Sequence, residues 1–181
     1  EEVLVLAQPG RAQAPPVTEV PASPQSTLLA QRDRLPIAIV KRDAAAVRAS
    51  VRRHRPDVVV HLAAIVTPGR GSNRELEWQV DVGGTKNVLE ACLESGVRKL
   101  VYTSSGAAYG YHADNPAWLT EDDPIRGNEA FAYSHHKRLV EEMLADYRAS
   151  QPQLEQIIFR IGTILGASVH NQITDLFEKP R

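Results

Sequence analysis

Short, mostly apolar runs recur along the chain at intervals that suit the strands of a parallel sheet. Residues 37–40, 58–60, 99–103 and 156–161 form four such runs. Continuous apolar runs are typical of strands that are covered on both faces, so each of these runs predicts a buried strand. The alternation within residues 2–7 predicts one further, short strand.

Helical stretches separate these runs. Asp43 is suited to cap a helix that continues to about His54, because its carboxylate can accept hydrogen bonds from the first free N–H groups. A longer helix is predicted from about Arg74 to Ser95, and Gly96 after it is suited to the left-handed conformation that ends many helices. Residues 131–150 predict another helix. Strands that alternate with helices indicate an α/β fold with a doubly wound parallel sheet.

The beginning of the chain has a different composition. Six of the twelve prolines fall within residues 1–36, and proline interrupts regular helices. We therefore expect an irregular N-terminal segment, residues 1–35, with one short strand. Residues 36–181 are expected to form one domain with the remaining strands and helices, in which residues 172–177 begin a last helix.

Composition and charge give no reason to expect nucleic acid or a membrane as a binding partner. The 181 residues carry a net charge of −1, which provides no electrostatic attraction to nucleic acid or to an acidic membrane. The single cysteine, Cys92, excludes an internal disulfide and is predicted to be a buried small hydrophobic residue. No apolar run approaches the length that spans a bilayer, and the first residues lack a basic stretch. We expect a cytoplasmic protein.

The candidate chemistry lies in one helix and the strand before it. Tyr133 and Lys137 are four positions apart, so both side chains project from the same face of the predicted helix. A free phenol has a pKa of roughly 10, and a cation beside it is expected to lower that pKa. Ser105 ends the preceding strand. A hydroxyl, a phenol and an ammonium are the groups that a hydride-transfer site needs to move a proton at a sugar or alcohol carbon.

A tyrosine four residues before a lysine is a weak signal alone, but three further segments accompany it. They are RPDVVVHLAA at 55–64, DVGGTKNVLEAC at 81–92 and VYTSSGAAYG at 101–110. Together with the tyrosine and lysine of YSHHK at 133–137, they occur in the order seen in one family. The chain resembles the extended short-chain dehydrogenase/reductases, and among them the NAD-dependent epimerase/dehydratase family. The resemblance covers residues 36–181 and implies a partial NAD(P)-binding domain with a Rossmann-like fold, which carries the serine, tyrosine and lysine of the site.

This resemblance implies roles for individual residues. Tyr133 matches the family's general acid/base, and Lys137 matches the lysine that binds the nicotinamide ribose. Ser105, or alternatively Ser104, matches the residue that binds the reacting oxygen. The implied cofactor is NAD, with NADP as the alternative. The residues implied to line it are Leu62, Ala63, Ala64, Tyr133, Lys137 and Ile161.

The resemblance is weakest at the N-terminus. The family binds pyrophosphate with a glycine-rich G-x-x-G-x-x-G turn after its first strand. Residues 7–13 match that turn only at Gly10. We therefore interpret residues 2–7 as the family's second strand rather than as a degenerate first strand. This interpretation leaves no strand beside residues 58–60.

Other positions differ from the family in ways that affect the expected chemistry. Gly106 and Ala107 stand where the family's dehydratases carry an Asp-Glu pair, so a dehydratase is not expected. Asp81 stands where the family usually has an asparagine. His135 and His136 show no zinc-ligand spacing and are predicted to be solvated. Glu141 and Glu142 are likewise predicted to form a solvated helix face.

Three functions remain open from the sequence. The first is an NAD(P)-dependent epimerase of a sugar nucleotide or related sugar. The second is a dehydrogenase or reductase of a sugar acid or alcohol, and the third is a non-catalytic fragment with weak or no cofactor binding. The expected partner is a small-molecule substrate, a nucleotide sugar. A homodimer through the helices at 74–95 and 131–150 is a further expectation from the family.

Overall fold

The computed structural model describes residues 3–6, 43–66 and 72–164. The strand predicted at 37–40 and the helix predicted at 172–177 lie outside the described residues. So does almost all of the N-terminal segment at 1–35.

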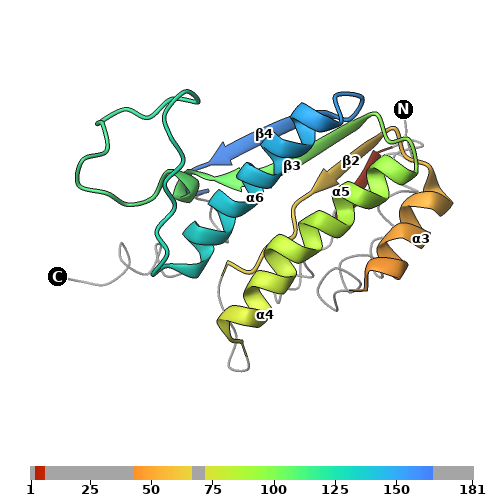
Figure 1. Cartoon of the computed structure of the whole chain (residues 1–181), viewed down its shortest axis with the longest axis horizontal. Coiled ribbons are helices and arrows are strands. Elements are labelled where there is room, and N and C mark those ends of the chain that lie inside the picture. Colours follow the sequence, from red (N-terminus) through yellow and green to blue (C-terminus); the bar gives the residue numbers. More distant parts are fainter. Residues whose placement is uncertain (1–2, 7–42, 67–71, 165–181) are drawn as a thin grey trace, which may run out of the picture.

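In the described part of the chain, four parallel strands form one sheet (Figure 1). In order across the sheet they are β1 (Val3–Leu6), β2 (Val58–His61), β3 (Lys99–Ser105) and β4 (Glu155–Ile161). All neighbouring pairs are parallel, so the carboxyl ends of the strands lie along one edge. The α/β class and the parallel sheet predicted from the sequence are confirmed.

The position of β1 corrects one interpretation. Val5 of β1 is paired with Val60 of β2, so a strand lies directly beside residues 58–60. In the doubly wound order 3-2-1-4-5-6, the neighbour of the fourth strand is the first strand. The interpretation of residues 2–7 as the family's second strand is therefore wrong, and β1 takes the first strand's position. Pairing along β2 satisfies backbone groups that would otherwise be exposed at its edge.

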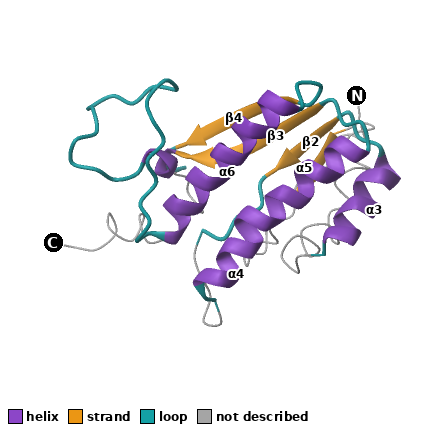
Figure 2. Cartoon of the chain, viewed as in Figure 1, coloured by secondary structure: helices purple, strands orange, loops and turns teal. Residues whose placement is uncertain are grey.

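The helices follow the predicted pattern closely (Figure 2). Asp43 caps the first described helix by accepting a hydrogen bond from the N–H of Ala46 at 2.9 Å. Gly96 follows the long helix with a φ of 69°. That long helix is divided by a π-helical turn. In chain order, the helical elements are α3 (Ala44–His54), α4 (Arg74–Trp78), the π-helical turn Gln79–Gly83, α5 (Gly84–Glu94), the 3₁₀ turn Gly106–Tyr109 and α6 (Ala132–Ser150).

The described helices α3, α5 and α6 lie over one face of the sheet, and the hydrophobic core fills the space between (Figure 1). Its fully buried members include Val47, Val51, Val59, Leu89, Leu100 and Leu144. Cys92 belongs to this core, which confirms the prediction of a buried small hydrophobic residue. Burial raises the pKa of its thiol to about 12. In the described part of the chain, no helix is long and apolar enough to cross a membrane.

Candidate active site

The structure brings Ser105, Tyr133 and Lys137 together at the carboxyl end of β3. Ser105 is the last residue of the strand, where its hydroxyl accepts from the N–H of Ala107 at 3.1 Å and acts to lower the pKa of the Tyr133 phenol. The Lys137 Nζ atom lies 5.6 Å from the centre of the Tyr133 ring. Because β3 and α6 meet here, residues separated by about 30 positions share one site.

The first turn of α6 is held in place by Ser134, which the sequence analysis did not single out. Its buried hydroxyl donates to the carbonyl of Ala107 at 2.6 Å and accepts from the N–H of Asn128 at 2.9 Å. The first bond joins α6 to the 3₁₀ turn that follows Ser105, and the second joins it to the loop before the helix. The serine between the catalytic candidates therefore sets the angle at which Tyr133 enters the site.

Lys137 is buried, with 4% of its surface exposed. Its ammonium donates to the Tyr102 hydroxyl at 2.9 Å and to the Thr103 carbonyl at 2.8 Å. Burial lowers the pKa of Lys137 to about 8, against the opposing effect of the Asp81 and Glu141 carboxylates. Tyr102 was missed by the sequence analysis, although the alternation of β3 puts it on the same helix-facing side as Leu100.

The expected lowering of the Tyr133 pKa is not what the structure shows. Burial raises the pKa of this phenol, and the charge of Asp81 adds to the increase, whereas the hydrogen bond with Ser105 opposes it. The Lys137 ammonium lies beside the ring and is bonded to Tyr102 and Thr103 rather than to the Tyr133 hydroxyl. The desolvation of the phenol therefore dominates.

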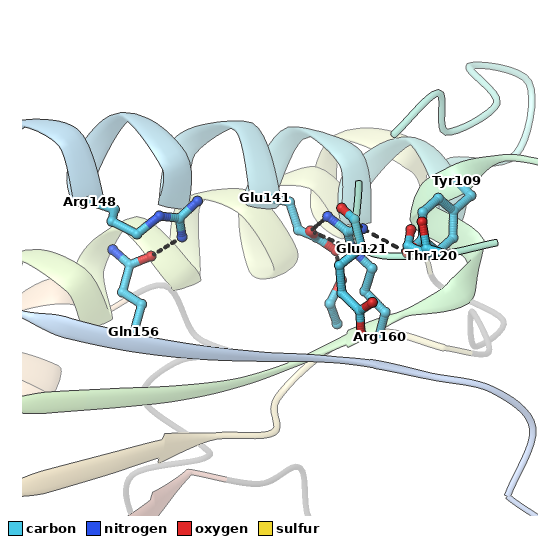
Figure 3. Close-up of polar contacts among 8 residues, drawn as sticks. Tyr109, Thr120, Glu121, Glu141, Arg148, Gln156 and Arg160 are labelled. Carbon is cyan, nitrogen blue, oxygen red and sulfur yellow. Dashed lines mark hydrogen bonds and ion pairs between the residues drawn. The ribbon is translucent and has the colours of Figure 1, made fainter. Parts of the chain in front are cut away.

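The alternative serine, Ser104, lies on the same helix-facing side of β3 as Tyr102 and has a different partner on α6. Its hydroxyl donates to the Glu141 carboxylate, which also accepts from the Arg160 guanidinium at 2.8 Å. Arg160 in turn donates to the Tyr109 hydroxyl at 2.7 Å (Figure 3). Glu141 is 4% exposed, so the prediction of a solvated glutamate at this position is wrong. The ion pair with Arg160 of β4, 19 positions away in the next element of the chain, stabilises its burial.

Apart from Tyr133 and Lys137 on α6, the residues implied to line the cofactor lie at the ends of β2 and β4. Ala63 is buried, Ala64 is half-buried and Leu62 is exposed. Ile161 pairs with Ser105 in the register of β3 and β4, so it lies beside the serine. Small side chains after β2 leave its backbone open to close approach. The stretch at 7–13, where the family's glycine turn would lie, is outside the described residues.

His136 also differs from its prediction. It is 3% exposed and its Nδ1 atom lies 3.0 Å from a carboxylate oxygen of Asp81. The prediction of a solvated histidine is therefore wrong for His136, whose partner is 55 positions away. In the part of the chain that the structure describes, no group of three or more His, Cys, Asp and Glu side chains could hold a metal ion.

Comparison with known proteins gives consistent matches. Residues 15–179 match the NAD dependent epimerase/dehydratase family. The UDP-glucose 4-epimerase of Erwinia amylovora is 32% identical over 132 residues, which are 72% of this chain and 38% of that protein. The structure of the UDP-Glc/GlcNAc 4-epimerase of Campylobacter jejuni matches with a TM-score of 0.61 and 26% identity, over 75% of this chain and 40% of that chain.

A second solved structure is more similar in sequence. The UDP-glucose 4-epimerase of Thermus thermophilus, whose structure is a complex with NAD, is 32% identical with a TM-score of 0.55. That match covers 66% of this chain and 38% of the Thermus chain. The chain thus spans less than half the length of these relatives.

Proposed function

Because the chain belongs to the NAD-dependent epimerase/dehydratase family, we propose that it carries the hydride-transfer site of a sugar-nucleotide epimerase that uses NAD. The observation that carries this proposal is the meeting of Ser105, Tyr133 and Lys137 at the carboxyl end of β3. Ligands of doubly wound sheets bind outside the carboxyl ends of the strands. Similarity to UDP-sugar 4-epimerases supports a nucleotide sugar as the substrate.

Each of the three side chains has a distinct task in this proposal. Tyr133 takes the proton from the sugar hydroxyl and later returns it, as a general acid/base. Ser105 binds the same oxygen and keeps it beside the phenol. Lys137, with a pKa of about 8, is mostly protonated at neutral pH. Two of its three protons are donated to Tyr102 and Thr103, which leaves the third for a ribose hydroxyl.

NAD, when bound, supplies the hydride acceptor and donor for the sugar carbon. The chain's residues fit the nicotinamide end of this cofactor. In this proposal Ala63 and Ala64 let a ring approach the backbone after β2, Leu62 precedes them in the chain, and Tyr133 and Lys137 face the ribose. Ile161 lies at the end of β4, beside Ser105. The pyrophosphate end has no glycine-rich turn in the sequence, so cofactor affinity is the decisive measurement.

The proposal also includes a homodimer. The exposed side of α6 contains Ala145, a small residue that would let a second copy of the helix approach closely. Exposed Trp78, at the end of α4, adds an apolar side chain on the neighbouring helix.

Calorimetric titration of the purified chain with NAD, and separately with NADP, tests cofactor binding first. We expect micromolar binding of NAD. Interconversion of UDP-glucose and its C4 epimer is then measured for the wild-type chain and for Tyr133→Phe. Loss of the phenol hydroxyl is expected to lower the rate by roughly 10²- to 10⁴-fold while NAD still binds, because proton transfer alone is removed.

The results of these measurements distinguish an epimerase from a dehydrogenase and from a non-catalytic fragment. Net reduction of added NAD by a sugar substrate would indicate a dehydrogenase, because an epimerase returns the hydride it removes. A folded chain that binds neither NAD nor NADP would indicate a non-catalytic fragment. Equal rates in the wild-type chain and Tyr133→Phe would exclude Tyr133 as the acid/base.

A further inference from the structure

Asp81 occupies a special position on the long helix. It lies within the π-helical turn Gln79–Gly83, between α4 and α5, and is 5% exposed. A π-helical turn is rare and occurs frequently at functional sites. In this chain the turn directs a buried carboxylate away from the helix and toward the candidate active site.

The two oxygens of this carboxylate contact different parts of that site. One accepts a hydrogen bond from the backbone N–H of Ile65 at 2.7 Å. The other lies 3.0 Å from Nδ1 of His136. Ile65 directly follows Ala63 and Ala64, and His136 directly precedes Lys137. A single side chain therefore joins the loop after β2 to the turn of α6 that bears the catalytic candidates.

The backbone of Asp81 is also fixed by a hydrogen bond. The Thr85 hydroxyl donates to the Asp81 carbonyl at 2.6 Å. Thr85 Oγ1 lies 3.0 Å from Nε2 of His61, the last residue of β2. All of these groups are buried. The π-helical turn is thus joined to the end of β2 through its backbone as well as to the following loop through its side chain.

Because Asp81 and His136 are buried, water cannot replace the hydrogen bonds between them. The side chains of His136 and Asp81 are 4% and 6% exposed, so neither has water as a substitute partner. A buried carboxylate is stable only when it is paired and hydrogen-bonded, and hydrogen bonds to charged groups are stronger than neutral ones. If either partner is lost, the remaining groups must rearrange, and the loop and the helix must shift relative to each other.

We infer that Asp81 and His136 form a positioning pair that sets the distance between the cofactor-lining loop at 62–65 and the Tyr133–Lys137 turn of α6. This role rests on the proposed function, because it assumes that the loop lines NAD. The pair acts through its hydrogen bonds. An amide at position 81 retains an oxygen for Ile65, and its N–H₂ can donate to Nδ1 of His136 when the neutral imidazole carries its proton on Nε2, so the geometry survives without the charge.

The test compares Asp81→Ala, Asp81→Asn and His136→Ala, with Glu77→Ala as the matched control. Glu77 is also a buried carboxylate on the same helical segment, but its partner is Ser72, at 2.8 Å. The first measurement is hydrogen exchange of the Ile65 amide in the chain without cofactor. The second is the NAD dissociation constant of each variant.

We expect exchange of the Ile65 amide to accelerate by roughly tenfold or more in Asp81→Ala, since a charge-assisted hydrogen bond is lost. Asp81→Asn is expected to retain most of the protection. His136→Ala is expected to accelerate exchange although His136 does not contact Ile65, because Asp81 loses the partner that holds it. Glu77→Ala leaves Ile65 exchange unchanged. The variants that lose the most protection of the Ile65 amide against exchange are also expected to bind NAD most weakly.

Unchanged Ile65 exchange in His136→Ala would overturn the positioning pair, because Asp81 would then bind the loop independently of α6. If Asp81→Asn and Asp81→Ala lost equal protection at the Ile65 amide, the charge of Asp81 rather than its hydrogen-bond geometry would hold the loop, and the inference would be wrong on this point. If Asp81→Ala does not fold, His136→Ala and Asp81→Asn decide the same question. A wild-type chain that binds no NAD would refute the proposed function. The exchange measurements are made without cofactor, so they test the Asp81–His136 pair independently of NAD binding.

Discussion

At the level of single residues, burial controls the protonation of the catalytic candidates. Lys137 has an ordinary pKa of 10.5 when exposed and a pKa of about 8 in the folded chain. The charged form is disfavoured because little water reaches it, and the carboxylates of Asp81 and Glu141 compensate only in part. The folded protein therefore releases this proton at a lower pH than the unfolded chain does.

This difference predicts how stability depends on pH. Below about pH 8 the ammonium is protonated in both states, and its burial penalty is fully present. As pH rises further, the folded state loses the proton while the unfolded state retains it, so the free energy of unfolding rises. Relative to Lys137→Met, the wild-type chain should gain up to ~2 kcal/mol between about pH 8 and about pH 9.5.

Denaturant unfolding of both proteins at several pH values measures this gain. The titration of Cys92 is common to the two proteins and cancels in the difference. Burial raises the pKa values of Tyr102 and Tyr133 above their ordinary value of 10.0, so both phenols stay protonated in the folded state over this pH range. Parallel stability curves for the wild-type chain and Lys137→Met would mean that the Lys137 pKa is not lowered by folding.

At the level of elements, the contact between the loop before α6 and the helix itself leaves no room for a side chain at Gly127. A Cβ atom there would lie 2.9 Å from the Ser134 carbonyl carbon and 2.9 Å from Cβ of Arg138. Both atoms belong to α6, and the Ser134 hydroxyl already binds the N–H of Asn128. The loop and the helix must therefore separate if residue 127 is enlarged.

Gly127→Ala is expected to destabilise the fold by about 1–3 kcal/mol, the usual cost of overpacking. Gly83→Ala is the matched control, because a Cβ there has nothing within 4 Å and the backbone is helical with a φ of −63°. Alanine should stabilise that position by roughly 0.5–1 kcal/mol. Thermal or denaturant unfolding measures both changes. Equal effects of the two substitutions would contradict the close contact at Gly127.

At the level of the whole molecule, a parallel sheet brings the carboxyl ends of its strands to one edge (Figure 1). Ala63 follows β2, Ser105 ends β3 and Ile161 ends β4. These positions are far apart in sequence but adjacent in the fold, because each strand pairs in register with the next. The outer surfaces of the helices are separate from this edge, so another copy could bind them without covering the site.

A charge introduced on the exposed side of α6 tests the proposed homodimer. Ala145→Glu introduces a charge on the exposed side of α6 and should convert a dimer to a monomer, because an unpaired charge would be buried between the copies. Ala45→Glu makes the same change on the exposed side of α3 and should leave the dimer intact. Light scattering gives the mass of each protein in solution. An unchanged mass for Ala145→Glu would count against the α6 surface.

Several features could be predicted because their causes are local. Asp43 caps α3 through the N–H of Ala46, three positions away. Gly96 adopts the backbone conformation that only glycine adopts easily, and Tyr133 and Lys137 share a face because they are four positions apart. Each of these relations spans a few residues of one chain segment, so the sequence itself contains both partners.

The apolar runs that become β2, β3 and β4, the periods of the helices and the residue types of the candidate site can all be read from the sequence. Which of these residues are buried, and which partners they have, depends on the folded chain. Glu141 and His136 occur on a helix that looks solvated in sequence, yet Arg160 and Asp81 approach them from β4 and from the π-helical turn. Desolvation and ion pairing depend on neighbours in space, and those neighbours are brought together only by strand pairing and helix packing.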